Sequence, residues 1–310
     1  MNILVLGANG YIGKAFVREL LKDKAIQNIK LFDITLPNED VLKNKKVSFF
    51  QGNILHEPSI NEMFKNVDIV FHFLGKAMVR RGTDVLTDDL SNDLGATITI
   101  LNAMVANYIK KIVFLSSGGA IYGSSNSSPI MEELNTCPIS TYGLVKQSCE
   151  TVISFYQRQF SIEPIILRVA SVYGPNYNKI GIQGVIPTFI DQIKNKKPIT
   201  VLGTGDESRD FIYIDDLINF LMSLKNTHFF SGIYNIGSGT STTVNEILSF
   251  LTKLSLHAPT INYVSKNNTD VDHIVLNSQK IREVFGWKPN KNIEEGIFEC
   301  WRIANNNSVN

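Results

Sequence analysis

The chain has 310 residues, of which 44% are hydrophobic and 19% are charged, and its formal net charge is +1. This composition is that of a globular protein with a sizeable core, and so small a net charge argues against nucleic-acid or membrane binding. Three widely spaced cysteines do not suggest a disulfide framework or a zinc ribbon, and we predict no metal site. Without a signal peptide or an apolar run near the ~20 residues of a membrane helix, we expect a soluble cytoplasmic protein.

The first half of the chain alternates short apolar runs with longer helical patterns. Runs rich in apolar residues predict strands at residues 3–6, 29–32, 47–50, 69–73, 112–115 and 165–167, and the continuous run at 3–6 is typical of a strand buried on both faces. Apolar residues at helical spacing cover residues 12–21, 90–108 and 141–160. Such alternation implies parallel pairing with right-handed crossovers, so we predict an α/β fold with a Rossmann-type doubly wound parallel sheet.

The regular alternation of strand and helix patterns ends after Arg168, where the predicted elements become shorter and less regular. We therefore predict two domains, one over residues 1–168 and a smaller α/β domain over residues 169–310. The segment of about 211–236 is expected to return to the first domain.

Two helix starts are predicted in the second half from their capping residues. Asp215 is placed to cap a helix that runs to Lys225. Thr243 and Glu246 have the spacing of a capping box, in which each side chain binds the backbone of the other residue.

A glycine-rich turn lies directly between the first predicted strand and the first predicted helix. It has the spacing Gly-x-x-Gly-x-x-Gly, which permits a tight turn, a close approach to a pyrophosphate, and close packing of helix on strand. The free N–H groups at the helix N-terminus then attract the phosphates. The alternative is that the glycines only form a turn. The candidate cofactor-binding residues of this turn are Gly7, Asn9, Gly10, Tyr11, Ile12 and Gly13.

Asp33 ends the second predicted strand, twenty residues after Gly13. A carboxylate at this place can accept hydrogen bonds from the adenosine ribose hydroxyls, and it would repel a 2′-phosphate. No Arg or Lys follows in residues 34–37, so the sequence predicts NAD rather than NADP as the cofactor. The alternative is that Asp33 is a solvated loop carboxylate.

Tyr142 and Lys146 lie four residues apart near the start of a predicted helix, which places them on one face. An ammonium group stabilises a nearby phenolate, so this tyrosine can take a hydroxyl proton while hydride leaves the same carbon. Taken alone, the spacing would indicate a surface pair. Its position after six alternations of strand and helix favours a catalytic pair.

With these features in place, the chain resembles the extended short-chain dehydrogenase/reductases, in particular the NAD-dependent nucleotide-sugar epimerase/dehydratase family of the UDP-glucose 4-epimerase type. The resemblance covers nearly the whole chain. Besides the glycine turn and the Tyr142–Lys146 pair, the matching segments are 116–123 (SSGGAIYG), 167–175 (LRVASVYGP), 203–205 (GTG), 209–211 (RDF), 234–239 (YNIGSG) and 285–289 (FGWKP).

The resemblance implies roles for individual residues. Tyr142 would be the acid and base of the reaction, and Lys146 would tune it and hold the nicotinamide ribose. Arg209 would bind the substrate diphosphate with its forked donors, unless it forms only a surface ion pair with Asp206 or Asp210. Further contacts are expected with substrate from Ser117, Ser171 and Val201, and with cofactor from Asn53, Ile54, Leu74 and Ser116.

Family members carry a Ser or Thr hydroxyl that donates a hydrogen bond to the reacting oxygen, and Gly118 stands at that position here. We predict that Ser117 supplies this hydroxyl, with Ser116 as the weaker candidate. The alternative is that both hydroxyls only satisfy backbone groups at the strand end. The adjacent Asp and Glu of 4,6-dehydratases are also missing from residues 118–120, which argues against dehydration.

Phosphate binding also departs from the family pattern. Relatives commonly carry Asn at the position of Ser171, and Arg shortly before the Asp270–Val271 pair, where residues 266–269 contain none. Binding of the diphosphate would therefore depend on Arg209, backbone amides or Lys266. The loop from Gly174 to Pro187 would line the sugar cleft.

The leading hypothesis is an NAD-dependent nucleotide-sugar 4-epimerase that acts on a UDP-hexose by transient oxidation at carbon 4. The first rival is a reductase of a dTDP- or UDP-linked 4-keto-6-deoxy sugar, which would use the same Tyr142 and Lys146. A remote rival is a non-catalytic dinucleotide-binding protein. The resemblance also implies a homodimer, paired through the helices predicted at 90–108 and 141–160.

Overall fold

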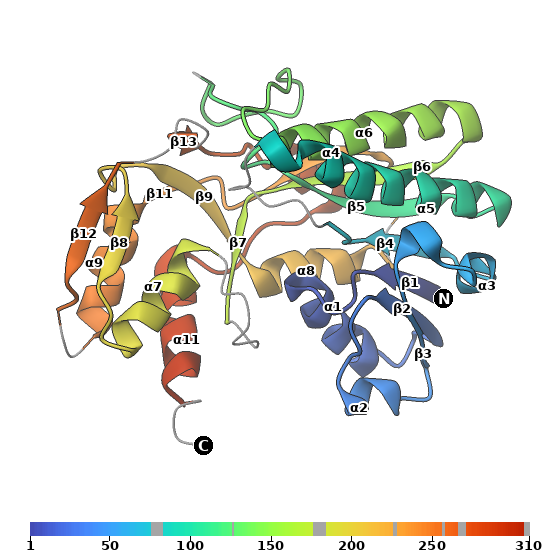
Figure 1. Ribbon diagram of the computed structural model, residues 1–310, viewed down its shortest axis with the longest axis horizontal. Helices are drawn as coiled ribbons and strands as arrows, with labels where there is room; N and C mark the ends of the chain where they lie inside the picture. Colours follow the sequence, from blue (N-terminus) through green and yellow to red (C-terminus); the bar gives the residue numbers. More distant parts are fainter. Residues whose placement is uncertain are drawn as a thin grey trace.

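A parallel sheet of seven strands forms the centre of the computed structural model, in the spatial order β10-β6-β5-β4-β1-β2-β3 (Figure 1). The model describes residues 1–75, 83–125, 127–175, 184–225, 228–255, 258–265 and 271–306. The strands are β1 (Asn2–Leu6), β2 (Asn28–Asp33), β3 (Val47–Gln51), β4 (Ile69–His72), β5 (Lys111–Ser117), β6 (Glu163–Val169) and β10 (Gly232–Ile236). The six predicted strands are confirmed, and β10 adds a seventh beside β6.

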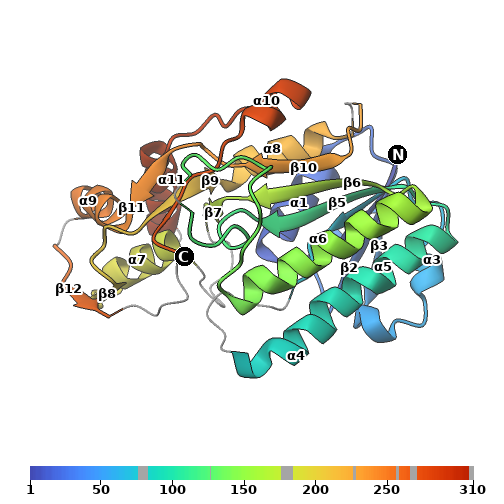
Figure 2. The same ribbon diagram turned by 90° about the horizontal axis from the view of Figure 1, so that it is seen from above.

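Helices cover both faces of this sheet, with α1 beside α8 on one face and α5 beside α6 on the other (Figures 1 and 2). The helices of this part are α1 (Tyr11–Lys22), α2 (Glu39–Leu42), α3 (Ile60–Phe64), α4 (Leu86–Asp89), α5 (Gly95–Ala106), α6 (Thr141–Phe160) and α8 (Ile214–Ser223), with short 3-10 turns η1 (Ile54–His56) and η2 (Thr83–Val85). Val113 and Leu115 of β5 point into the core shared with α1 and α8. Ile112 and Phe114 point into the opposite core. A strand buried on both faces is apolar throughout, which confirms the predicted doubly wound fold.

The remaining elements form a smaller region with its own core. A four-stranded sheet joins β7 (Ser171–Tyr173), β9 (Ser208–Tyr213), β11 (Ser241–Thr243) and β13 (His273–Ile274), and a two-stranded sheet pairs β8 (Ile199–Leu202) with β12 (Ile261–Val264). Its helices are α7 (Val185–Lys194), α9 (Val244–Leu254) and α11 (Ile293–Asn306), whereas α10 (Gln279–Phe285) packs on β10 of the central sheet, with Ile281 in the core shared with α1 and α8. Across the described ranges, we find no helix that is long and apolar enough to cross a bilayer.

The predicted helix over 90–108 differs from the structure. A π-helical turn, η3 (Leu90–Leu94), stands between α4 and α5, and α5 ends at Ala106. A π turn takes one residue more than an α turn, and apolar spacing gives no sign of that extra residue. The helix predicted over 141–160 is confirmed as α6.

The capping box is confirmed at α9, where the Glu246 amide donates to Thr243 Oγ1 over 3.1 Å and the Thr243 amide donates to Glu246 Oε2 over 2.7 Å. The prediction that Asp215 caps a helix was wrong. Tyr213 occupies that position in α8, and Asp215 lies in the first turn, 3.6 Å from the Arg18 guanidinium. A carboxylate there stabilises the helix through its dipole, without a capping hydrogen bond.

Candidate active site

Steric limits explain the glycines of the turn between β1 and α1. Gly7 has a φ of +84°, and a Cβ there would lie 2.9 Å from the Phe73 carbonyl carbon. A Cβ on Gly13 would lie 2.1 Å from the Gly7 carbonyl oxygen, so any side chain would push α1 away from the turn. The N-cap position of α1 is Gly10, which makes no side-chain capping bond. The turn thus offers a close backbone approach and a positive helix end to a pyrophosphate.

Asp33 is fixed against this turn at the end of β2. Its Oδ2 accepts a 2.8 Å bond from the Asn9 amide, and its Oδ1 accepts 3.1 Å bonds from the Thr35 amide and hydroxyl. The Asn9 side-chain amide donates to the Thr35 carbonyl, which joins the turn to the loop after β2. Oδ2 has a second lone pair beyond the bond from Asn9, so Asp33 retains capacity for a ribose hydroxyl.

The other predicted cofactor contacts lie at the same edge of the sheet. The Leu74 amide is 3.0 Å from the position of a Cβ on Gly7, so the chain after β4 crosses directly over the turn. Asn53 begins η1 and accepts a 3.1 Å bond from the Leu55 amide through Oδ1, and Ile54 is buried. The structure therefore places these three predicted residues after the carboxyl ends of β3 and β4, at the same edge of the sheet as the turn.

Lys146 is buried, with 7% of its surface exposed, and this excludes the surface Tyr–Lys pair that its spacing alone would indicate. Its Nζ donates to the Leu115 carbonyl over 3.1 Å and lies 4.9 Å from the centre of the Phe114 ring. The Tyr142 ring lies 5.9 Å from the same Nζ. Gly143 lets the start of α6 lie against the chain after β5, because a Cβ there would lie 2.4 Å from the Ala120 carbonyl oxygen. The ammonium is thus held between β5 and the phenol.

The serine segment shows why the family hydroxyl cannot stand at Gly118. A Cβ on Gly118 would lie 2.4 Å from Leu276 Cδ1 and 3.1 Å from the Arg168 carbonyl oxygen. Ser117 is the last residue of β5 and is half-buried. Ser116 is buried on the same side of β5 as Phe114, and its Oγ has no hydrogen-bond partner among the described residues.

Arg209 lies on β9, half-buried. Its Nη1 donates to the Ser208 carbonyl over 2.9 Å and to the Asp272 carbonyl over 3.1 Å, which directs the guanidinium across β9 and β13. Asp210 points the other way and is buried, where it accepts bonds from the amides of residues 238, 239 and 276. Burial raises the pKa of Asp210, and these hydrogen bonds oppose that effect.

The other residues predicted to contact the substrate differ in how far they are buried. Ser171 opens β7 and is half-buried beside Phe211 of β9. Val201 is 1% exposed, and its side chain points into the core of the smaller region. The side chains of Thr200 and Leu202 alternate to the opposite face of β8. A nucleotide base could therefore contact only the backbone of Val201, or the side chains of Thr200 and Leu202. Most of the predicted cleft loop, residues 176–183, and the segment 266–270 lie outside the described residues.

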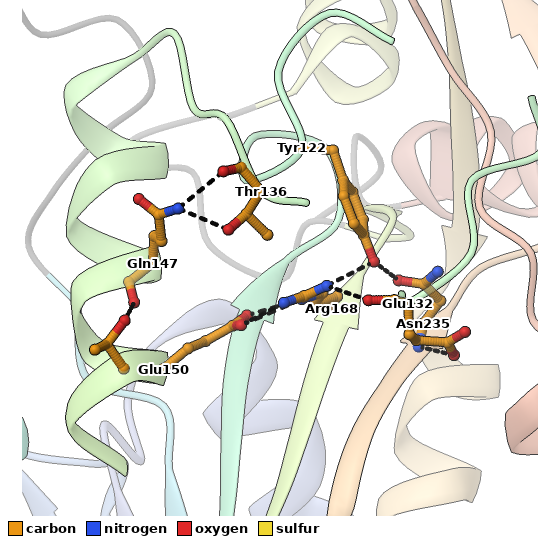
Figure 3. A network of polar contacts seen from close by, with 8 residues as sticks. Tyr122, Glu132, Thr136, Gln147, Glu150, Arg168 and Asn235 are labelled. Atoms are coloured by element: carbon orange, nitrogen blue, oxygen red, sulfur yellow. Dashed lines mark hydrogen bonds and ion pairs between the residues drawn. The ribbon is translucent and has the colours of Figure 1, made fainter. Parts of the chain in front are cut away.

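A buried polar network beneath the site was not predicted (Figure 3). The Arg168 guanidinium donates to Glu150 Oε2 over 2.8 Å and to the Tyr122 hydroxyl over 3.0 Å. The Tyr122 hydroxyl donates to Asn235 Oδ1 over 2.7 Å, and the backbone N–H of Asn235 donates to Glu132 Oε1 over 2.7 Å. The network therefore ties α6 to β6, β10 and the loop after β5.

This network fixes the helix that carries Tyr142 and Lys146. Burial alone would lower the pKa of Arg168, but the hydrogen bonds and charge of Glu150 raise it above its ordinary value. Burial raises the pKa of Tyr122, so that hydroxyl keeps its proton and can donate it. One feature of the sequence does indicate this network. Arg168 stands inside an apolar strand pattern, and a charge buried there requires a buried partner.

Comparison with known proteins agrees with this geometry. Residues 3–237 match the family model described as the NAD dependent epimerase/dehydratase family. The chain is 35% identical to a putative UDP-glucose 4-epimerase of Methanocaldococcus jannaschii, over 99% of both chains. It is 29% identical to a dTDP-4-dehydro-6-deoxyglucose reductase of Escherichia coli, over 95% of both chains.

Among solved structures, the UDP-glucose 4-epimerase of Thermotoga maritima with UDP-glucose matches all of both chains, with a TM-score of 0.90 and 28% identity. The UDP-glucuronic acid 4-epimerase of Bacillus cereus, in complex with UDP-glucuronic acid and NAD, matches 99% of both chains with a TM-score of 0.90 and 26% identity. Both similarities extend over the dinucleotide turn, the Tyr–Lys pair and the smaller region.

Proposed function

The chain belongs to the NAD-dependent epimerase/dehydratase family, and we propose that it is an NAD-dependent 4-epimerase of a UDP-hexose. The observation that carries this proposal is Lys146 Nζ, which is buried between the Leu115 carbonyl and the Tyr142 ring and lies beside Gly75, in the chain that crosses the glycine turn. That arrangement suits a phenol that gains and loses a proton beside a hydride acceptor. The names of the relatives at 35% and 28% identity support the substrate class.

In the proposed reaction, Tyr142 takes the proton of the sugar 4-hydroxyl, and Lys146 stabilises the phenolate before the transfer. Bound NAD supplies a reversible hydride acceptor. Ser117 donates a hydrogen bond to the reacting oxygen, where negative charge develops. After the keto sugar turns over in the cleft, Tyr142 returns the proton to the oxygen on carbon 4, whose other face would then take back the hydride. Arg209 holds the diphosphate during this rotation, with forked donors suited to phosphate.

The residues that would hold NAD belong to the region of residues 1–168, and those for the nucleotide sugar belong mainly to 169–310, with 211–236 assigned to the first region. The Gly7–Gly13 turn would bind the pyrophosphate, and Asp33 would bind the adenosine ribose. On this proposed division, the reacting carbon would lie where the two regions meet, at Tyr142.

A second candidate is a reductase of a dTDP- or UDP-linked 4-keto-6-deoxy sugar. It is supported by the 29% identity to the reductase of Escherichia coli. Such an enzyme would use the same proton donor once per turnover and would exchange its cofactor after each cycle.

Purified protein incubated with UDP-glucose, UDP-galactose and their N-acetyl forms, without added cofactor, separates these functions. We expect interconversion of at least one epimer pair. No interconversion, together with NADH consumption on a 4-keto-6-deoxy substrate, would establish the reductase instead. If the protein shows neither activity, a non-catalytic dinucleotide-binding protein is favoured.

We also propose a cytoplasmic homodimer formed through α5 and α6. The two helices lie side by side on one face of the sheet (Figure 2), and α6 exposes Leu144, Phe155 and Phe160. The free thiols of Cys137, Cys149 and Cys300 suit a reducing compartment. Light scattering should give twice the chain mass, and Phe155→Glu should reduce it to one chain. A monomeric wild-type protein would contradict the dimer.

A further inference from the structure

The carboxylate of Asp33, at the end of β2, is held by three hydrogen bonds from within the chain. The Asn9 amide donates to Oδ2 over 2.8 Å, and the amide and the hydroxyl of Thr35 both donate to Oδ1 over 3.1 Å. Only 8% of Asp33 is exposed. A buried carboxylate with donors on both oxygens keeps one orientation, because rotation would leave those donors and its own oxygens unpaired.

Asn9 and Thr35 are also bound to each other. The side-chain amide of Asn9 donates to the Thr35 carbonyl and, over 3.3 Å, to Thr35 Oγ1. Thr35 itself is exposed, so hydrogen bonds rather than core packing determine where its hydroxyl lies. The turn between β1 and α1 and the loop after β2 thus hold the Asp33 carboxylate from two sides.

The hydrogen bonds of Thr35 limit what Asp33 is able to bind. An ionised carboxylate has about four lone-pair positions for donors. The two donors of Thr35 occupy both positions of Oδ1, and the Asn9 amide occupies one position of Oδ2. The position that remains, on Oδ2, suits a single hydroxyl group.

We propose that Thr35 is a positioning residue that sets the preference of this chain for NAD over NADP. With Asn9, it fixes the remaining acceptor position of Asp33 toward a ribose hydroxyl, and it prevents the carboxylate from turning away from a 2′-phosphate. The inference rests on the proposed binding of the adenosine ribose by Asp33. Thr35 acts through Asp33 and is not itself assigned a contact with the cofactor.

A fixed carboxylate has opposite effects on the two cofactors. NAD meets an acceptor that is already oriented, so its binding does not lose free energy in ordering that side chain. NADP brings a phosphate against a carboxylate that has no other stable orientation, and like charges repel strongly at short range. Ile34 and Leu36, on either side of Thr35, are apolar and 68% and 63% exposed, so neither supplies a cation to offset that repulsion.

Cofactor binding to the nucleotide-free, full-length chain tests this inference without any sugar substrate. Isothermal titration calorimetry gives the Kd of NAD and the Kd of NADP. Thr35→Val removes the hydroxyl and keeps the amide, so the Kd of NAD should rise about fivefold, while that of NADP stays the same or falls. The preference for NAD should therefore fall by about fivefold or more.

Two control variants make this result specific. Thr35→Ser keeps the hydroxyl, so it should keep the wild-type ratio of the two Kd values within about twofold. Thr87→Val makes the same exchange at an exposed threonine of α4, and it should match the wild type. An equal ratio in Thr35→Val and the wild type would overturn the inference.

The background of Asp33→Ala shows whether Thr35 acts through Asp33. In that background, Thr35→Val should change the Kd of NAD by less than about twofold, because the carboxylate that Thr35 holds is gone. A loss of about fivefold in both backgrounds would mean that Thr35 contacts the cofactor directly, and it would overturn the positioning role.

Asp33→Ala also separates this inference from the proposed function. If Asp33→Ala loses the preference for NAD and Thr35→Val keeps it, only the inference fails. If Asp33→Ala keeps the preference, the proposed ribose contact fails, and the inference fails with it. If Thr35→Val does not fold, Asn9→Ala takes its place, because it removes the bonds to Thr35 and keeps the backbone bond to Asp33. It should lower the preference for NAD in the same direction, and an unchanged preference would overturn the inference.

Discussion

Glu150→Gln should destabilise the protein severely, because it leaves the Arg168 guanidinium buried without a counter-ion. Both residues are 5% exposed, and their charges meet at 2.8 Å. Removal of one partner of a buried pair costs about 3–5 kcal/mol of unfolding free energy. Urea unfolding followed by circular dichroism measures this change directly. The loss should also loosen α6 and so reduce kcat, since Glu150 lies one turn beyond Lys146.

Two variants make this prediction specific. Glu39→Gln removes one partner of the exposed pair with Lys43, and it should change the unfolding free energy by less than about 0.5 kcal/mol. The double variant Glu150→Gln/Arg168→Met should recover part of the loss, because no unpaired charge remains. A destabilisation by Glu150→Gln below about 1 kcal/mol would refute the assigned role of the pair.

Three further substitutions test other parts of the site. Gly118→Ala should cost about 1–3 kcal/mol in thermal or urea unfolding, since its Cβ would lie 2.4 Å from Leu276 Cδ1, and Leu276→Ala should relieve part of that cost. Ser117→Ala should lower kcat by about 10²–10³ while circular dichroism and bound NAD stay unchanged; near-normal kcat would remove Ser117 from the site. Gly7→Ala should abolish NAD binding in calorimetry, because of its φ of +84° and its contact with Phe73.

The parts of the fold that depend on short-range pattern could be predicted from the sequence. The first six strands are short runs rich in apolar residues, and α6 has apolar periodicity, so both could be placed. The π turn η3 could not, because one extra residue leaves the apolar spacing almost intact. The capping role predicted for Asp215 failed because an acidic residue serves a helix start either as a cap or within the first turn.

The site likewise has features that could be predicted from local sequence and features that could not. The turn, Asp33 and the Tyr142–Lys146 pair could be predicted because each depends on spacing within one segment. The bond between Tyr122 and Asn235 joins residues 113 positions apart, and no local pattern gives that contact. The clash that keeps residue 118 a glycine likewise comes from Leu276, far along the chain.

The fate of the hydride tests the central claim most directly. UDP-glucose carrying deuterium at carbon 4 is converted by the purified protein in the presence of unlabelled NADH, and the product is analysed by mass spectrometry and NMR. A 4-epimerase that returns the same hydride should yield UDP-galactose with the deuterium retained at carbon 4. Deuterium lost to the NADH pool, or no galactose epimer at all, would contradict the proposed mechanism.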